Sequence, residues 1–405
     1  KHTRLVLTSP STPHFNDGLD NENNDLIIRE GDVLGSDPRS DEALDHKHCW
    51  RRGARYTVVD LLGQGTFGQV LKCRDNWTKR LVAVKVLKNK PAYFRQGLLE
   101  IGILTAINTN ADRTGEHHTL RFLDHFLYRN HLCLVNELLG MNLYELIKQK
   151  GYRGLEVPLI RTYTRQILDA LIAMDEAEIV HCDLKPENVL LCTAQAARIK
   201  IIDFGSATPP GAGQGLYKYI QSRYYRAPEA ILGLPYTHSI DMWSAGCMLV
   251  EMVTGSPLFE GRSDLDQLVR IAAVLGTPPQ SMLEHRTKYP DAFVRTDSGL
   301  QFAPHLINGS SRSGSKSSSS EPRSLRSIVC GSDVPPKLSP ATGRPMLLSD
   351  AERFHDLVAR MLVYKPHKRI TPAQALEHPF VTGALDWPTT PVAAPQLLLQ
   401  RAPAD

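Results

Sequence analysis

Eight consecutive residues, His181-Cys182-Asp183-Leu184-Lys185-Pro186-Glu187-Asn188, constrain the fold of this chain more than any other segment. They place an acid, a lysine and an amide in one polar stretch. Twenty residues after Asp183, the apolar run Ile201-Ile202 ends at Asp203, a pattern typical of a buried strand that delivers one carboxylate to a site. This spacing fits phosphoryl transfer, in which a base accepts a hydroxyl proton and oxygen atoms hold magnesium.

The composition indicates a globular chain with more than one lobe. Of its 405 residues, 42% are hydrophobic and 22% are charged, which is enough to bury a large core. The net charge of +4 is small for this size, so we expect no direct binding of nucleic acid. Seven scattered cysteines without a C-x-x-C pair favour reduced thiols in the cytoplasm, the nucleus or both. No window approaches 18 apolar residues and no signal peptide is evident, so we expect no membrane span.

The predicted elements change from strands to helices along the chain. β-rich runs predict an antiparallel sheet with strands at 56–59, 69–72, 81–86 and 132–135. A helix is predicted over 94–104, although Gly97 and Gly102 each cost about 1 kcal/mol there, so packing must hold it. Beyond about Met141 the pattern is helical, with an apolar stripe over 160–174 and a buried central helix over 242–253. An α+β fold follows.

Polar segments flank and interrupt this pattern. We expect a disordered segment over 1–20 and an N-terminal extension over 21–55 that packs on the sheet and contains a small hairpin around residues 29–32. The Ser-rich segment 308–326 predicts a disordered insertion, with a phosphorylation or docking role as the alternative. We expect residues 388–405 to form a C-terminal tail. Since the chain lacks an initiator Met, we expect an excerpt of a longer protein.

A glycine-rich segment and a lysine precede the catalytic octapeptide. The motif G-x-G-x-x-G is formed by Gly63, Gly65 and Gly68 and lies between two strands, which argues against a dinucleotide-binding fold. Glycines at these positions predict a close approach of backbone N–H groups to phosphates. A plain glycine-rich hairpin is the alternative. Lys85 ends an apolar strand and needs a partner there. Glu100 is the natural one, and the pair would hold the α- and β-phosphates.

The octapeptide supplies the other roles. Asp183 is the predicted base, Lys185 would neutralise charge at the γ-phosphate, and Asn188 and Asp203 would bind magnesium. Each residue alone is unremarkable in a polar loop. Together with the later Ala227-Pro228-Glu229 they occur in one order at workable spacings, so chance agreement is very small.

This set resembles the eukaryotic protein kinase superfamily over about residues 56–380. Three segments narrow the resemblance to the dual-specificity tyrosine-regulated kinases: the octapeptide, Tyr217-Lys218-Tyr219-Ile220-Gln221-Ser222-Arg223-Tyr224-Tyr225-Arg226-Ala227-Pro228-Glu229, and Asn142-Leu143-Tyr144-Glu145-Leu146. Three more are similar to the Yak branch: Asn21-Glu22-Asn23-Asn24-Asp25-Leu26, Leu62-Gly63-Gln64-Gly65-Thr66-Phe67-Gly68 and Leu139-Gly140-Met141-Asn142-Leu143-Tyr144. The resemblance implies a bilobal fold, with a small, mostly β N-lobe over 56–139 and a larger, mostly α C-lobe over 140–387.

The same resemblance implies a monomeric enzyme that uses ATP and Mg²⁺. It would phosphorylate Ser or Thr before proline in other proteins and Tyr219 in its own chain. Adenine would lie between Leu62, Val70, Ala83 and Leu190, with hinge backbone at Glu137 and Leu139 and ribose at Asn142. Asp241 would brace the catalytic loop and Glu229 would pair with Arg369. Glu145 and Glu187 would bind a substrate arginine, with solvated carboxylates as the alternative.

Regulation is predicted to act through the modified tyrosine. Phosphate on Tyr219 would carry about −1.5 to −2 charges, and Arg223 and Arg226 lie close enough in sequence to clamp it. Cys182 replaces the arginine that most relatives use to read this phosphate, which shifts that task to Arg223 and Arg226. A redox role for Cys182 is the less favoured hypothesis.

Asn136 replaces a bulky hydrophobic residue beside the hinge, so a more polar and more open adenine pocket is expected. Three other functions compete with the active dual-specificity kinase. A pseudokinase scaffold is disfavoured because no essential catalytic residue is missing. A mitogen-activated type of proline-directed kinase would have Thr where Tyr217 stands. A small-molecule kinase is disfavoured by Ala227-Pro228-Glu229 and the helices that follow.

Overall fold

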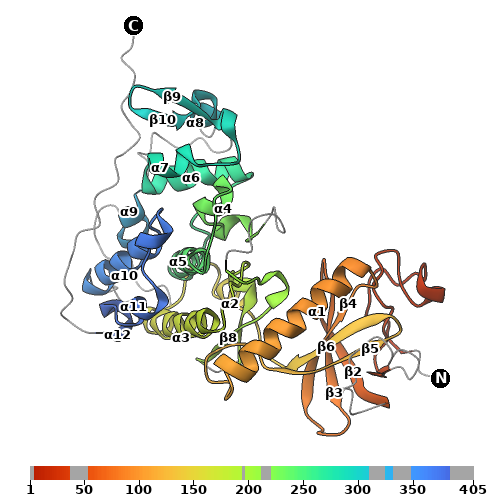
Figure 1. Cartoon of the computed structure of the whole chain (residues 1–405). Coiled ribbons are helices and arrows are strands. Elements are labelled where there is room, and N and C mark those ends of the chain that lie inside the picture. Colours follow the sequence, from red (N-terminus) through yellow and green to blue (C-terminus); the bar gives the residue numbers. More distant parts are fainter. Residues whose placement is uncertain are drawn as a thin grey trace. The chain divides into compact units, whose positions relative to one another are not determined.

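The computed structural model describes residues 4–36, 53–193, 197–210, 220–309, 324–331 and 348–383. The chain divides into two compact units (Figure 1). The first unit comprises Lys1–Gly140 with Cys192–Ala194, and the second comprises Met141–Leu191 with Gln195–Asp405. Among the described residues, no helix has both the length and the apolar composition needed to cross a membrane.

The first unit is built on a six-stranded antiparallel sheet, in the order β1-β2-β3-β4-β6-β5. Its strands are β1 (Val33–Ser36), β2 (Gly53–Gln64), β3 (Gly68–Asp75), β4 (Leu81–Leu87), β5 (Phe122–Tyr128) and β6 (His131–Glu137). Residues alternate between buried and partly exposed along β3 and β4, as expected of strands with one face on a core. Helix α1 (Pro91–Ala106) packs on this sheet and continues into a π-helical turn, Ile107–Ala111.

Close packing explains why α1 tolerates a glycine in its interior. A Cβ at Gly97 would lie 2.3 Å from Leu87 Cδ1 and 2.8 Å from a Leu132 methyl carbon, so only glycine lets the helix approach the sheet this closely. Glu100 and Leu104, one and two turns further on, are buried on the same side. The predicted helix over 94–104 is therefore confirmed, and packing holds it.

Residues 4–36, called the N-terminal extension from here on, correct two predictions. Residues 4–20 are not disordered, because their polar groups bond to the chain: Thr8 Oγ1 donates to Leu26 O at 2.9 Å, and Asp20 Oδ1 lies 2.8 Å from His131 Nε2. The small hairpin around residues 29–32 does not form either. Leu26 and Ile28 enter the core beside the 4–8 segment, while β1 pairs with β2 instead.

The second unit consists mainly of helices (Figure 1). They are α2 (Leu143–Gln149), α3 (Val157–Glu176), α4 (Pro228–Leu232), α5 (Ser239–Thr254), α6 (Asp264–Leu275), α7 (Gln280–Glu284), α8 (Pro304–Gly309), α9 (Leu325–Cys330), α10 (Leu348–Met361), α11 (Pro372–Leu376) and α12 (Pro379–Thr382). Two hairpins join them: β7 (Val189–Leu191) with β8 (Ile199–Ile201), and β9 (Phe293–Thr296) with β10 (Gly299–Phe302).

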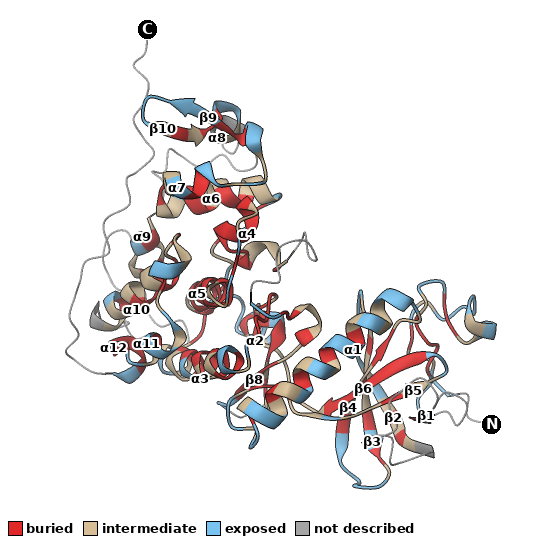
Figure 2. Cartoon of the chain, in the orientation of Figure 1, coloured by how far each residue is buried: buried red, intermediate tan, exposed pale blue. Residues whose placement is uncertain are grey.

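Helix α5 is the centre of this unit, as Figure 2 shows. Thirteen consecutive residues, Ile240–Met252, are buried, because α3 and α10 pack on it. The predicted buried helix over 242–253 is confirmed. Gly255 ends α5 in a left-handed conformation with φ 79°, where its missing side chain avoids Tyr152 O.

The α+β fold class, with a mostly β N-lobe and a larger, mostly α C-lobe, is confirmed. The Ser-rich insertion is only partly described, since residues 310–323 lie outside the described ranges, as does the tail 388–405. Both ends of the insertion are helical: α8 reaches Gly309, and Ser324 caps α9 by accepting a hydrogen bond from Ser327 N. Disorder over 308–326 is therefore a wrong prediction at those ends.

Candidate active site

The predicted glycine-rich segment forms the turn between β2 and β3 in the first unit. Gly65 N donates to Gly68 O at 2.8 Å, which closes the turn. Gly68 has φ 150°, and a Cβ there would lie 2.1 Å from Val86 O, so the turn requires glycine at this position. A Cβ at Gly63 or Gly65 would meet nothing within 4 Å, which leaves open space over the backbone. Backbone that is open in this way would allow phosphate groups to approach closely.

Lys85 and Glu100 form the predicted ion pair, also within the first unit. Lys85 Nζ, on β4, donates to both carboxylate oxygens of Glu100, on α1, at 2.8 and 2.9 Å. The lysine side chain is 15% exposed and the glutamate 4%. Because α1 carries one partner and the sheet the other, the position of the helix fixes the direction of the ammonium group.

The catalytic octapeptide lies in the second unit, between α3 and β7, and α5 braces it as predicted. Asp241 accepts hydrogen bonds from His181 N at 2.6 Å and Cys182 N at 3.0 Å. His181 Nε2 lies 2.9 Å from Ile202 O, and its ring packs edge-on against Phe204. The loop is thus fastened to the buried helix and to the segment that carries Asp203.

Asp183 is the most heavily bonded group of this loop. Its Oδ2 accepts from Lys185 Nζ at 2.6 Å, and its Oδ1 accepts from Ser222 N at 3.0 Å and Ser222 Oγ at 2.7 Å. Lys185 Nζ also donates to Ser222 Oγ at 3.2 Å. These bonds hold one carboxylate and one ammonium group side by side, the arrangement needed to take a proton beside a transferred phosphoryl group.

Ser222 is a site residue that the sequence analysis missed. It lies 39 positions after Asp183, and nothing in its local sequence marks it as a partner of the base. The neighbouring Gln221 was missed as well. It is buried with φ 62°, its N–H donates to Cys182 O at 2.8 Å, and its side-chain amide bonds to Ser244 Oγ and Ile240 O on α5. The signal available in the sequence was its position between Tyr219 and Arg223, inside the predicted regulatory segment.

Asn188 and Asp203, the predicted magnesium ligands, are brought together by the β7–β8 hairpin. Val189 pairs with Ile201, and Ile202 N donates to Asn188 O at 2.9 Å. Asn188 Nδ2 donates to Asp183 O at 2.9 Å, which turns the amide oxygen away from that carbonyl. Carboxylate and amide oxygens suit Mg²⁺. No cluster of three His, Cys, Asp or Glu suited to a metal occurs in the described ranges, so such an ion would need further oxygens from a nucleotide or water.

The sequence matches the family described as "Protein kinase domain" over residues 56–381. The chain belongs to the protein kinase family. The chain is 42% identical over 397 residues to the serine/threonine-protein kinase ppk15 of Schizosaccharomyces pombe, covering 95% of this chain and 70% of that relative. It is 49% identical over 284 residues to the dual specificity protein kinase YAK1 of Saccharomyces cerevisiae, covering 70% of this chain and 33% of that relative. It is 40% identical over 402 residues to the YAK1 homolog of Arabidopsis thaliana, covering 94% of this chain and 40% of that relative.

These relatives confirm the Yak-like branch. The chain spans 70% of the first relative's length and well under half of the other two. The family uses ATP and Mg²⁺ and acts on proteins, which agrees with the donor atoms found in each unit.

The predicted adenine residues of the first unit lie on its sheet or just beyond it. Val70 and Ala83 are partly buried and Leu62 is 50% exposed. Glu137 N donates to Arg121 O at 3.0 Å, so adenine would have to use the carbonyl of Glu137. Leu139 follows β6 and is partly buried.

Asn136 brings a polar atom into this unit. It is 7% exposed, and its Oδ1 has no hydrogen-bond partner among the described residues. An unpaired buried acceptor favours a ligand that donates a hydrogen bond to it. The prediction of a more polar environment beside the hinge is thereby supported.

In the second unit, Asn142 caps α2 and pairs with Leu190 in an isolated bridge. Asn142 Oδ1 accepts from Glu145 N at 2.8 Å, and Glu145 Oε2 accepts from Asn142 N at 3.1 Å, which completes a capping box. Glu145 and Glu187 are both exposed. A substrate arginine at Glu145 would have to share a carboxylate that already caps the helix.

Tyr219 lies outside the described residues, but both predicted clamp residues are described. Arg226 is buried and binds Asp264 at 2.5 Å and Gln221 O at 2.6 Å. The Arg223 side chain is 36% exposed, with its Nε 3.7 Å from Asp264. Of the two, Arg223 therefore offers more guanidinium surface to a phosphate, while Arg226 holds the segment in place.

Burial speaks against the redox hypothesis for Cys182. Its side chain is fully buried, with Sγ 3.6 Å from Thr208 Oγ1, and burial raises the pKa of the thiol. A reactive cysteine needs an accessible thiolate. Cys182 instead contributes its backbone, which adopts φ 63° so that its N–H reaches Asp241 and its carbonyl reaches Gln221.

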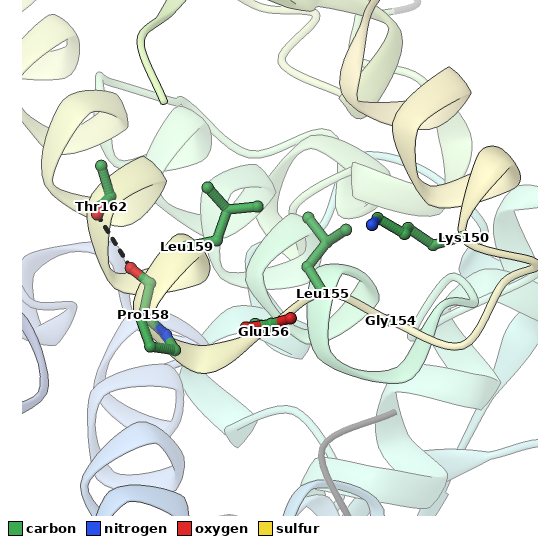
Figure 3. A pocket seen from close by; sticks show the side chains of 7 residues that line it. All are labelled: Lys150, Gly154, Leu155, Glu156, Pro158, Leu159 and Thr162. Carbon is green, nitrogen blue, oxygen red and sulfur yellow. Dashed lines mark hydrogen bonds between the residues drawn. The ribbon is translucent and has the colours of Figure 1, made fainter. Parts of the chain in front are cut away.

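A separate cavity of about 430 Å³ lies where α2 ends and α3 begins (Figure 3). Gly154, with φ 83°, passes so close to Val253 O that a Cβ would lie 2.1 Å from it. No predicted site residue lines this cavity; its walls are Lys150, Gly154, Leu155, Glu156, Pro158, Leu159 and Thr162. It is therefore distinct from the catalytic loop.

Proposed function

We propose that this chain transfers the γ-phosphoryl group of ATP to Ser and Thr hydroxyls of other proteins and to its own Tyr219. The observation that carries the proposal is the bonding of Asp183, whose carboxylate is fixed by Lys185 and Ser222. A base held by these donors, and by Asn188 Nδ2 at 3.4 Å, loses little entropy when a hydroxyl group arrives. The printed names of two relatives as dual specificity kinases support the second acceptor type.

Each residue has one role in this mechanism. Asp183 orients the acceptor hydroxyl and takes its proton, and Lys185 places positive charge beside the γ-phosphoryl oxygens. Lys85, aligned by Glu100, binds the phosphates, and the backbone near Gly63 and Gly65 covers them. Asn188 and Asp203 would hold Mg²⁺, which neutralises phosphate charge when bound.

Substrate choice and regulation are proposed from the same resemblance. The acceptor precedes a proline, and Glu145 and Glu187, both exposed, attract an arginine upstream of it. Phosphate on Tyr219 binds Arg223, with Arg226 as the buried support. We further propose a monomer that resides in the cytoplasm, the nucleus or both and binds no nucleic acid directly.

Expression in a kinase-poor host tests the proposal. The wild-type chain is expected to carry phosphate on Tyr219 and to phosphorylate Ser-Pro and Thr-Pro peptides in the presence of magnesium and ATP. Asp183→Asn is expected to do neither. Equal tyrosine phosphate in both proteins, mapped by mass spectrometry, refutes the catalytic assignment, and nucleotide binding without turnover by the wild type would indicate a pseudokinase scaffold.

A further inference from the structure

The phosphate-binding hairpin is held from outside by the N-terminal extension. Gln64 and Gln69 are directly opposite each other in the β2–β3 register, so their side chains project from the same face. Gln69 is buried; its Nε2 donates to Leu26 O at 2.6 Å, and its Oε1 lies 2.9 Å from Thr8 Oγ1. The extension therefore contacts both strands next to the turn.

Gln64 makes the second half of this contact with Ser9. Ser9 N donates to Gln64 Oε1 at 3.1 Å, and Gln64 Nε2 donates to Ser9 O at 2.6 Å. The same Nε2 donates to Asp25 Oδ2 at 3.0 Å. Lys88 Nζ lies 3.5 Å from Asp25 Oδ2 and is the cation of this cluster. We call the Ser9–Gln64–Asp25 contact the hairpin clamp.

Ser9 has the properties of an acceptor for a proline-directed kinase. It is exposed, its Oγ makes no hydrogen bond within the described ranges, and Pro10 follows it. Both of its backbone polar groups, however, are used in the hairpin clamp. An enzyme that surrounds Ser9 must first separate it from Gln64, so modification and the clamp exclude each other.

We propose that Ser9 is a phosphorylation site for a proline-directed Ser/Thr protein kinase and that its phosphate keeps the hairpin clamp open. Ser9 Oγ forms a bond to the γ-phosphorus of ATP while the bond from that phosphorus to the β–γ bridging oxygen breaks. ADP leaves, and the hydroxyl proton passes to the catalytic carboxylate of the modifying enzyme.

Charge explains why the clamp does not close again. The phosphate brings about −1.5 to −2 charges to a residue whose carbonyl shares one amide donor with the Asp25 carboxylate. Lys88 supplies one positive charge, which cannot balance both anions. Without the clamp, the turn that contains Gly63 and Gly65 loses its contact with Ser9 and keeps its strand pairing, Gln69 and the contacts of Phe67 with Lys88 N and Tyr93, so nucleotide binds less tightly. This last consequence rests on the proposed function.

The modification is tested on the full chain carrying Asp183→Asn, which removes self-phosphorylation. A recombinant mitogen-activated kinase and ATP are added, and phosphorylated Ser9 is quantified by mass spectrometry. Thr12, followed by Pro13, is a matched internal control, because it is exposed and makes no hydrogen bond within the described part of the chain. Gln64→Ala is expected to raise the initial rate of Ser9 phosphorylation about tenfold, because the loss of about one net hydrogen bond to a charged network corresponds to that factor. The rate of Thr12 phosphorylation is expected to change by less than about twofold.

Phosphate on Thr12 but none on Ser9, in both the Asp183→Asn chain and its Gln64→Ala derivative, overturns the site. Equal rates at Ser9 with and without Gln64 overturn the role of the clamp. A second experiment replaces the added kinase by the wild-type chain and shows whether this chain phosphorylates Ser9 in trans. If only this experiment fails, the result counts against the proposed proline-directed activity and not against Ser9 as a phosphorylation site.

The effect on nucleotide is measured by binding of a fluorescent ATP analogue to the Asp183→Asn chain, so that it does not depend on catalysis. Phosphorylated Ser9 is expected to raise the Kd several-fold. Gln64→Ala is expected to raise it by a similar factor, and phosphate on Ser9 in that variant to add little, since both changes remove the same contact. An unchanged Kd after Ser9 phosphorylation, or full additivity with Gln64→Ala, refutes release of the clamp.

Discussion

Removal of Arg369 provides the sharpest test of the packing around α5. Glu229 and Arg369 have side chains that are 1% and 0% exposed and are joined by hydrogen bonds of 2.8 and 3.1 Å. The guanidinium also lies 5.2 Å from the ring centroid of Trp243 and bonds to Ser239 O. Arg369→Met strands a buried carboxylate, which costs about 3–5 kcal/mol. In a unit of this size, that loss lowers Tm by about 6–20 °C.

Thermal denaturation followed by fluorescence measures the effect, and an exposed ion pair supplies the control. Arg326 and Glu352 are 66% and 51% exposed at 3.2 Å, so Arg326→Met is expected to change stability by less than about 1 kcal/mol. The double variant Glu229→Leu/Arg369→Met is expected to recover part of the loss, because no charge is left unpaired. A Tm for Arg369→Met within about 2 °C of the Arg326→Met value refutes the reasoning.

Three further predictions concern the pH dependence of stability, glycine substitutions in the β2–β3 turn, and the hydrogen bond between Ser222 and the Asp183 carboxylate. Burial raises the pKa of Glu251 from 4.5 to about 7. The contribution of Glu251 to stability, at most about 3 kcal/mol, is therefore full below about pH 4.5 and is lost as the pH rises to about 7. Glu251→Gln is expected to remove this dependence of the free energy of unfolding on pH, measured by urea unfolding between about pH 4.5 and 8, and an unchanged dependence contradicts the prediction. Gly68→Ala places a Cβ against Val86 O and is expected to lower Tm, whereas Gly65→Ala faces open space and is expected to keep Tm while raising the KM for ATP; equal Tm losses would disprove the difference. Ser222→Ala removes a hydrogen bond to the Asp183 carboxylate and is expected to lower kcat about tenfold or more, while Ser222→Thr retains most activity; wild-type kcat in the alanine variant argues against the bond.

Local patterns predicted strands β2, β3, β4 and β6 of the first unit but not β5, and they predicted the chemistry of the second unit. Lys85 and Asp183 could be found because phosphoryl transfer fixes both the residue types and their order along the chain. Helix α5 could be found because burial on all sides leaves a continuous apolar run. These features depend on a few neighbours in sequence or on a motif with strict spacing.

Contacts between distant polar residues could not be predicted in the same way. Asp20 meets His131 across 111 positions, and Ser222 meets Asp183 across 39. A polar, proline-containing N-terminal segment has the composition of a disordered chain unless its partners are known. The order of residues 4–20 is decided by buried acceptors and donors on the sheet, such as Gln69, which the local sequence does not identify.

The buried cysteines allow the opening of each unit to be timed separately by thiol labelling. Cys73 and Cys133 lie in the core of the first unit, and Cys182 and Cys247 in that of the second; all four are nearly inaccessible. Burial raises the pKa of Cys73 to about 12 and also raises those of the other three, so a labelling reagent must wait for the surrounding structure to open. Labelling rates measured at each cysteine in native buffer would therefore report the free energy of opening of the first unit's core and of the second unit's core independently.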